Sequence, residues 1–365
     1  ATGPGFLAQV YGDRARTMAS IFSSLGIFLS IVGQILSAVA LLTSMFTLKP
    51  LTAAFIAVIL VVFYVIFGGV WGTGIVGSLK IILLYISMMA AGWAAYKLGG
   101  GISGFQARLP AYPWFSMFGR GYGRDLAAGF SLLVGVVSTQ TYLQAVFSGK
   151  NARVSQLGAF ISGLITIPIG IAGIFVGLFM RVNFPQINAG EALPFFILEY
   201  LPHWLGGIVL ATLLISVIGT GAGLVLGIST MLSQDIYKKF FAPNAPDKSV
   251  LLFSRISIVI VSTLTLGFVS GNLNSLILKW SILSMGLRGA TICLPLLFAI
   301  FLKGFVTPKA GRLAIGLAPL ATILWAVFGR ESVDPLYVGI LASFFILVLV
   351  SIADKKPLTL NSSAK

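Results

Sequence analysis

The sequence predicts an all-α, polytopic membrane protein with about ten transmembrane helices. Hydrophobic residues make up 58% of the 365-residue chain and charged residues only 9%, and the mean hydropathy is +1.02. A soluble domain of this size cannot bury so much apolar surface, because its exterior must stay polar enough for water. A bilayer removes this constraint, since its hydrocarbon solvates the outer face of the protein.

The apolar residues form runs that are long enough to cross a bilayer as helices, which takes roughly 20 residues each. The runs are continuous, unlike the short alternating segments of an outer-membrane barrel. They therefore predict a helical bundle. In chain order, the predicted spans are 17–46, 51–70, 75–97, 126–148, 152–180, 204–237, 249–270, 273–302, 313–329 and 333–353.

The formal net charge of +15 would suit a nucleic-acid-binding protein, but the distribution of the charge indicates topology instead. With both termini in the cytoplasm, about fourteen Lys and Arg residues lie inside and about seven outside. We therefore expect no nucleic-acid partner, and a multi-pass protein of the cell (plasma) membrane with both visible termini cytoplasmic. The outward segment 98–125 is the exception, because it carries Arg108, Arg120 and Arg124.

The polar stretches between the spans are short, so we expect one transmembrane transport domain over 1–365 and no soluble domain. Residues 98–125, 181–203 and 238–248 are interpreted as loops, with a short surface helix at 192–202. Cys293 lies inside a span and excludes a disulfide framework or a cysteine metal cluster. The chain begins without Met in a loop-like segment, and we expect N-terminal sequence to be missing.

Three polar features interrupt the apolar spans at similar depth. They are Ser138-Thr139-Gln140-Thr141 in 126–148, Ser216 with Gly219-Thr220-Gly221 in 204–237, and Arg288 at the centre of 273–302. A polar group without a partner at this depth costs several kcal/mol by order of magnitude, so it usually faces a cavity or another polar group. Together the three features outline a central site.

Two glycine motifs have simpler explanations than ligand binding. Gly72, Gly74 and Gly77 match the dinucleotide fingerprint GxGxxG, but the flanks are membrane helices and residues 78–98 contain no acid. We interpret them as a tight connection between spans. Gly223 and Gly227 favour close helix packing, whereas Gly219 beside Thr220 also loosens the helix and frees carbonyls for ion binding.

Arg288 has two interpretations from the sequence. It either pairs with backbone carbonyls at a helix interface, or it binds a substrate carboxylate in a cavity through its planar, two-pronged guanidinium. No acidic residue lies at midplane depth in any predicted span, so a buried salt bridge is not available. His203 and Lys279 lie near span ends, where functional roles are not expected. Nothing resembles a catalytic constellation, so we expect a protein that is not an enzyme.

Five segments carry a resemblance to the sodium:solute symporter family over nearly the whole chain. PGFLAQVYGDRAR resembles the family's "pefLeeRYGsrar", Gln34 falls where the family often has Gln, and TQTYLQAVFSGKN is similar to "nqyiiQR.laAkd". GGVWGTGIVGSLK parallels "GG..AV.wTDviQ". The most specific match is LATLLISVIGTGAGLVLGISTMLSQDIYKKF, which resembles "laallaAimSTlsS.l...Sslit.DiYkk".

This resemblance implies the leucine-transporter fold, with two inverted repeats of five helices. Family members commonly have about three helices ahead of the point where this chain starts, so the resemblance implies that these are absent. Residues 1–97 would then be the remainder of the first repeat and 126–302 the second repeat. The helices in 313–353 would be peripheral.

The resemblance also implies a sodium site where the 204–237 helix meets the missing broken helix of the first repeat. On this chain the site would use the Ser216 carbonyl, position Gly219 and the Thr220 hydroxyl. The family usually has two adjacent hydroxyl residues there, and this chain keeps only Thr220. The family's Asp and Gln fall on Gly77 and Lys80. We therefore hypothesise that the Lys80 amine replaces sodium and couples transport to protons, as a lysine on the equivalent helix does in some relatives sharing the fold. The alternative is that Lys80 only snorkels toward the cytoplasmic surface.

For the solute, the resemblance points to Thr139 and Gln140, with Tyr142 and Gln144 on the same segment. Gln34 and Arg288 are the candidates from facing helices. The arginine favours a small carboxylate over a sugar. The predicted function is therefore secondary active, cation-coupled symport of a small organic solute by alternating access, with Na⁺ or H⁺ as the coupling ion and no other cofactor. A transporter-like solute sensor and an inactive, truncated transporter are the alternatives.

Overall fold

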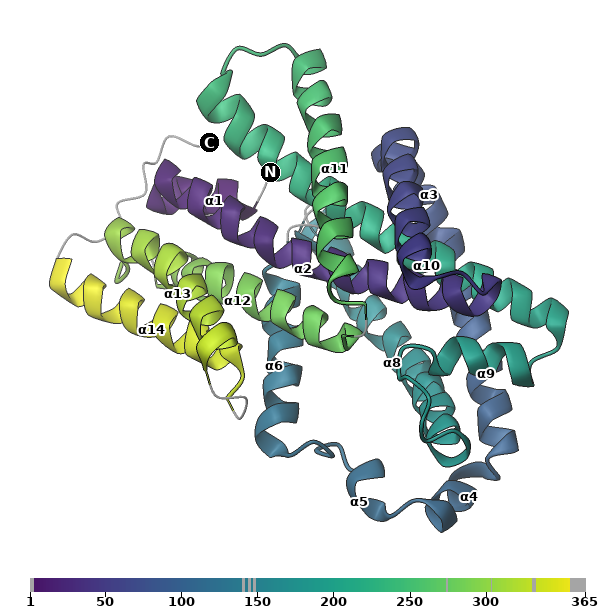
Figure 1. Ribbon diagram of the computed structural model, residues 1–365. Coiled ribbons are helices and arrows are strands. Elements are labelled where there is room, and N and C mark those ends of the chain that lie inside the picture. Colours follow the sequence, from purple (N-terminus) through teal and green to yellow (C-terminus); the bar gives the residue numbers. More distant parts are fainter. Residues whose placement is uncertain are drawn as a thin grey trace.

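The structure is a computed structural model that describes residues 3–139, 142, 143, 146, 149–273, 275–302, 304–329 and 333–354, with the backbone alone described for 68–76 and 78. All regular secondary structure in these residues is helical (Figure 1). The helices are α1 Gly3–Tyr11, α2 Asp13–Phe46, α3 Pro50–Leu98, α4 Gly101–Arg108, α5 Ala111–Trp114, α6 Tyr122–Val137, α8 Ala152–Asn183, α9 Ala192–Tyr200, α10 His203–Met231, the π-helix η1 Leu232–Phe241, α11 Asp247–Ser270, α12 Ile277–Phe301, α13 Pro308–Phe328 and α14 Pro335–Asp354.

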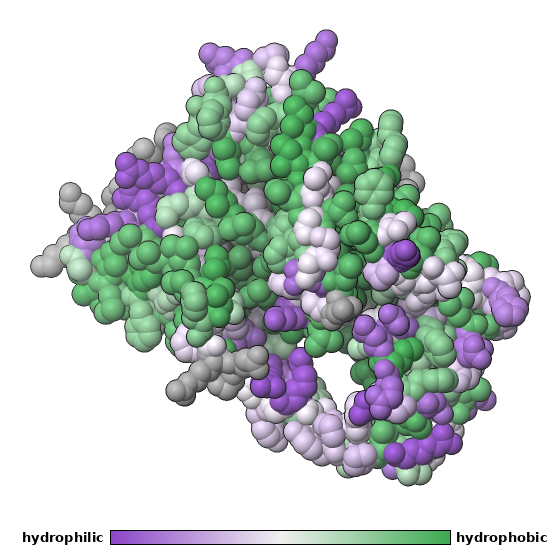
Figure 2. All heavy atoms as spheres, viewed as in Figure 1, coloured by the Kyte–Doolittle hydropathy of each residue, from purple (hydrophilic) through white to green (hydrophobic). Residues whose placement is uncertain are grey.

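Nine segments of the described residues are long and apolar enough to cross a membrane. They confirm nine of the predicted spans in order. The tenth, 126–148, differs because α6 ends at Val137 after 16 residues. The surface of the molecule is apolar over much of the face seen in Figure 2, with hydrophilic side chains gathered toward its edges. Exposed Phe, Leu and Ile residues are abundant on the spans, as expected when lipid covers the outside.

The predicted connection at Gly72–Gly77 is wrong, because α3 continues through it as one helix from Pro50 to Leu98. Each glycine costs a helix roughly 1 kcal/mol relative to alanine, but glycine keeps its backbone N–H and so does not interrupt the hydrogen-bond ladder. Only proline would remove a donor, and the segment after Pro50 contains none. By length and composition α3 holds two candidate spans, Pro50–Phe67 and Leu79–Leu98.

Helix α2 lies at the centre of the bundle (Figure 1) and packs against α3, α10 and α12. In its most apolar window 67% of the residues are buried, compared with 11% in the window of α8. Glycines set the close approaches: a Cβ added to Gly26 would come within 2.5 Å of the Arg288 Cγ, and one at Gly33 within 3.3 Å of the Ser281 hydroxyl. Helix α2 is therefore the element that positions polar groups from several others.

Helices α13 and α14 lie side by side at one edge of the bundle and pack against α12 (Figure 1). Helix α9 confirms the short helix expected in 192–202. The predicted loop 98–125 differs in detail, because it contains the short helices α4 and α5. The predicted span 204–237 also continues further, since α10 passes directly into η1, which ends at Phe241.

The beginning of α2 is tied to η1 by charged groups that the sequence did not single out. The Asp235 carboxylate is only 3% exposed; it accepts a hydrogen bond of 3.1 Å from the Ser20 hydroxyl and lies 3.7 Å from the Arg16 Nε. Lys239 Nζ lies 3.0 Å from Asp13 Oδ1. These contacts fix η1 against the beginning of α2.

We predict that Asp235→Ala lowers the free energy of unfolding by about 2–4 kcal/mol, because it leaves the Arg16 guanidinium and the Ser20 hydroxyl without this carboxylate. Thermal unfolding of the purified protein in detergent measures the effect. Asp247→Ala is the matched control, since Asp247 is fully exposed in its 3.9 Å pair with Lys238. Equal melting temperatures for the two variants would contradict the prediction.

Candidate functional site

A lysine from α3 reaches the middle of α10. Lys80 Nζ lies 3.5 Å from Thr220 Oγ1, to which it donates a hydrogen bond. A Cβ added to Gly219 would lie 3.9 Å from the same Nζ and 3.7 Å from the Tyr64 hydroxyl oxygen. The structure thus brings together Lys80, Gly219 and Thr220, three of the four residues expected at the coupling site. It adds Tyr64, which the sequence gave no reason to select.

The fourth residue, Ser216, lies one turn earlier on α10. Its carbonyl oxygen accepts a 2.7 Å hydrogen bond from the Thr220 hydroxyl. Its own hydroxyl is buried and has no hydrogen-bond partner among the described residues. This segment therefore offers hard oxygens of the kind that sodium prefers, but it places the Lys80 ammonium beside one of them.

The local donor set does not fit a sodium ion while Lys80 is charged. The ammonium already donates to Thr220, and it would repel a second positive charge placed a few ångströms away. Lys80 therefore lies beside an oxygen that the family resemblance assigns to sodium.

Arg288 lies where α12 meets α2 and the end of α6, and its side chain is 1% exposed. Its Nη1 donates to the Thr139 hydroxyl at 2.7 Å, and its Nη2 donates to the hydroxyls of Ser30 at 3.1 Å and Ser284 at 2.9 Å. Its Nε donates to the Ser284 carbonyl at 3.1 Å. The Ser284 hydroxyl in turn contacts the Gly26 carbonyl. Every one of these partners is neutral.

Among the described residues, neither Lys80 nor Arg288 forms an ion pair. In the described spans the acidic residues lie at the ends, as Asp13, Asp235, Asp247 and Asp354. Hydrogen bonds to hydroxyls and carbonyls offset part of the cost of burying a charge, but they do not neutralise it. A bound anion would therefore be stabilised at this site more than a neutral molecule.

The predicted span 126–148 is interrupted at Ser138, where α6 has ended and the backbone turns (φ −97°, ψ 0°). The Thr139 hydroxyl donates to the Gly135 carbonyl at 2.5 Å, in the manner of serines and threonines that compete with helical hydrogen bonds. Thr139 is fully buried and Tyr142 is 46% exposed. Gln140 and Gln144 lie outside the described residues. Of the solute candidates on this segment, the structure joins Thr139 to Arg288.

Helix α2 contacts both α10, next to Thr220, and the Arg288 side chain. Gln34 is half-buried, and its Cβ lies 3.5 Å from the position of a Cβ on Gly221 of α10. Ser30, one turn earlier on α2, faces Arg288. The two side chains are about 6 Å apart along the helix axis. The spacing of Ser284 and Arg288 by four residues was a signal that both lie on one face of α12, but sequence reasoning missed Ser30 and Ser284.

A cavity of about 590 Å³ lies above this network, between α2 and the start of α12. Its lining includes Ser281, which precedes Ser284 by one turn on α12, and the rim residue Arg120. The Arg120 Nε donates to Asp125 Oδ1 at 2.7 Å. The backbone N–H of Arg120 and then its guanidinium hold the pKa of the Asp125 carboxyl below its usual range. Ser281 is the lining residue that lies nearest along α12 to the Arg288 network, and Glu191 adds an acidic side chain to the cavity wall.

Comparison with known proteins agrees with this architecture. The model of the sodium:solute symporter family matches residues 1–329. The chain belongs to this family. This chain also has the fold of a solved Na⁺-coupled sialic acid symporter in a substrate-bound outward-open state. The TM-score is 0.77 at 16% identity, and the match covers 99% of this chain and 78% of that one. The inverted-repeat leucine-transporter fold expected from the sequence is thereby confirmed.

Two curated relatives of this symporter-family chain align over only part of their length. The uncharacterized symporter YhjB of Bacillus subtilis is 22% identical over 81% of this chain and 61% of its own. A sodium/proline symporter of Haemophilus influenzae is 25% identical over 42% of this chain and 31% of its own. The chain therefore spans about three fifths or less of these relatives. The family is one of transporters, and the membrane-spanning helices are those of a multi-pass membrane protein.

Proposed function

We propose that this chain carries a small carboxylate across the cell membrane by symport with a cation, and that the cation is a proton carried by Lys80. Membership of the sodium:solute symporter family supports cation-coupled transport. The observation that carries the finer proposal is the 3.5 Å contact between Lys80 Nζ and Thr220 Oγ1. It puts a protein ammonium where the family resemblance implies a sodium ion.

In this scheme the Lys80 amine accepts a proton from the outer solution while the carboxylate binds. The nitrogen lone pair forms the new N–H bond, and the ammonium donates to Thr220. After the bundle reopens toward the cytoplasm, the ammonium loses that proton to water and the solute leaves. The proton gradient drives the cycle, because the charged lysine and the anionic solute stabilise each other in the low-dielectric interior.

Arg288 is the proposed carboxylate-binding residue. In the state described, Thr139, Ser30 and Ser284 occupy its guanidinium. We infer that a solute carboxylate replaces one or more of these hydroxyls, which are weaker acceptors for a cation than a carboxylate is. Gln34, Gln140, Tyr142 and Gln144 would donate or accept hydrogen bonds around the rest of the solute, and Ser216 and Thr220 would provide oxygens for the coupling cation.

The proposed mechanism is alternating access in the two-repeat architecture. We assign residues 1–97 to the first repeat, 126–302 to the second, and 313–353 to peripheral helices, with both visible termini in the cytoplasm. The cavity of about 590 Å³ over Ser281 would be the outer approach to the site.

Uptake by proteoliposomes tests the solute class. Purified protein is reconstituted with an inward gradient of protons and sodium together, and radiolabelled monocarboxylates, dicarboxylates, neutral amino acids and sugars are offered singly. We expect accumulation of at least one carboxylate and none of the sugars, because two unpaired cations favour an anion. Accumulation of a sugar with no carboxylate uptake would contradict the proposal. Liposomes without protein provide the baseline.

A further inference from the structure

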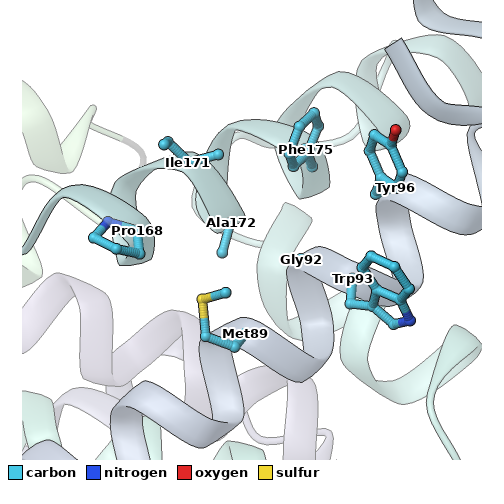
Figure 3. Close-up of a pocket in the computed structure, with 8 residues that line it drawn as sticks. All are labelled: Met89, Gly92, Trp93, Tyr96, Pro168, Ile171, Ala172 and Phe175. Carbon is cyan, nitrogen blue, oxygen red and sulfur yellow. The ribbon is translucent and has the colours of Figure 1, made fainter.

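A groove of about 470 Å³ lies between the second half of α3 and α8, lined by side chains of both helices (Figure 3). Its lining is mainly apolar, with Met89 from α3 and Ile171 and Phe175 from α8. None of the residues assigned above to the cation or the solute lines it. The groove is therefore a separate feature of the molecule.

Helices α3 and α8 pack along each other, and their closest approach lies beside the groove. At Gly92 an added Cβ would come within 2.5 Å of the Ala172 Cβ, so the two backbones approach as closely as they can. Pro168 lies within α8 and supplies no backbone N–H to the helix. On either side of this contact the larger side chains stand apart and leave space between them (Figure 3).

The groove opens onto an apolar surface. Trp93 is 62% exposed and Ile171 48% exposed, and on α8 beyond the groove Ile174 is 58% exposed. Water would not be retained against such a lining, whereas a hydrocarbon chain would gain contacts and lose none of its solvation. An occupant with an apolar tail fits this surface.

The two ends of the groove differ in chemistry. Met89 and Pro168 lie toward one end, and Trp93, Tyr96 and Phe175 lie toward the other (Figure 3). Lys97 Nζ lies 5.2 Å from the centre of the Trp93 ring, so an ammonium stands beside this second end. The Tyr96 hydroxyl and the Trp93 indole N–H add two donors, and the lining contains no acidic side chain.

One arginine of the segment that follows α3 lies on an element that packs against the groove helices. The segment 98–125 is expected outside, yet it carries three arginines. Arg108 ends α4, which packs against both α3 and α8. Phe105 of α4 stacks on Phe175 of the groove, with ring centroids 6.3 Å apart. Arg108 therefore lies on a helix that packs against both groove helices, whereas Arg120 lines the other cavity.

We propose that this groove binds one anionic phospholipid, with an acyl chain between α3 and α8 and the head-group phosphate at Lys97 and Tyr96. Aromatic rings with polar edges and a neighbouring lysine are typical of the membrane–water interface. No residue of the proposed transport site lines the groove, so the test of the lipid site does not depend on the identity of the solute or of the coupling ion.

Native mass spectrometry of the full chain in detergent tests the proposal. The probes are phosphatidylglycerol and phosphatidylcholine with identical oleoyl chains, supplied in equal amounts. We expect one retained phosphatidylglycerol per chain, with a preference of about fivefold over phosphatidylcholine, as one lysine near the surface confers. Lys97→Gln should abolish that preference. Lys279→Gln is its control, since Lys279 also stands over a tryptophan, at 6.0 Å from the Trp280 ring, but away from the groove.

A second pair of variants tests the acyl-chain position. Ile171→Trp fills the groove and should reduce lipid retention by roughly tenfold or more, the loss expected when several buried methylene groups are displaced. Ile174→Trp places the same side chain on the same helix outside the lining and should retain the lipid. Equal retention in the two tryptophan variants, or equal binding of the two lipids to the unaltered chain, would overturn the proposal. Cross-linking of two copies of the chain through residue 171 would also overturn the proposal, because a second chain would then occupy the groove.

Discussion

Replacing Lys80 by glutamine should reduce proton-driven solute uptake by at least tenfold, which corresponds to about 1.4 kcal/mol or more. Glutamine keeps an amide that can hydrogen-bond with Thr220 but cannot carry a proton or a charge. Uptake into proteoliposomes under an imposed proton gradient measures the effect. Lys238→Gln, at the exposed end of η1, is the control and should behave like the unaltered protein. Undiminished proton-driven uptake by Lys80→Gln would show that this lysine does not couple transport.

A second substitution tests why the lysine is there. Gly219→Ser restores a hydroxyl that the family resemblance places beside Thr220, and an added Cβ meets only ordinary contacts at 3.7–3.9 Å. In Lys80→Gln combined with Gly219→Ser, the ammonium is gone and a hard oxygen is gained. We expect sodium to stimulate uptake by this double variant and not by Lys80→Gln alone. Equal sodium responses in the two variants would count against an ion site at this position.

Arg288→Gln should weaken binding of the anionic solute by roughly a hundredfold, about 3 kcal/mol, because the carboxylate loses its charge-assisted hydrogen bonds. Arg288→Lys keeps the charge but loses the planar fork, so it should restore only part of the affinity. The concentration dependence of uptake measures this. Lys279→Gln, on the same helix α12, should leave the affinity unchanged.

Arg288 also holds three helices together, so its variants need a measurement of folding. Arg288→Gln removes donors to Thr139, Ser30 and Ser284. Thermal unfolding in detergent shows whether the variant remains folded, and added carboxylate should raise the melting temperature of the unaltered protein but not of Arg288→Gln. An equal rise in both proteins would contradict the assignment of Arg288 to the solute.

The sequence predicted the helical spans well because each is a local property. Whether a run of apolar residues can span the bilayer depends on its own length and not on the helices packed against it. The exceptions have local causes as well. The run 126–148 is apolar throughout its first half, but Ser138 and Thr139 end α6 through their hydroxyls, and the glycines near Gly72 do not break α3.

The site was harder to predict, because its contacts join residues far apart in the chain. Arg288 meets Thr139 across 149 positions, and Lys80 meets Thr220 across 140. Polarity at midplane depth selected Arg288, Thr139 and Thr220 singly, and the family resemblance selected Lys80. Ser30 and Tyr64 were missed because a serine or a tyrosine in a span is common, and only the packing of α2 and α3 on other helices gives them partners. Asp235 was missed because its burial depends on Ser20 and Arg16 of α2.

The identity of the driving ion tests the account most directly. Proteoliposomes holding the unaltered protein are given an inward proton gradient in sodium-free buffer, or an inward sodium gradient at equal pH on both sides, with the membrane potential clamped. Because the Lys80 ammonium occupies the position beside Thr220, we predict solute accumulation with the proton gradient and none with the sodium gradient. Strong accumulation driven by sodium alone would contradict the account.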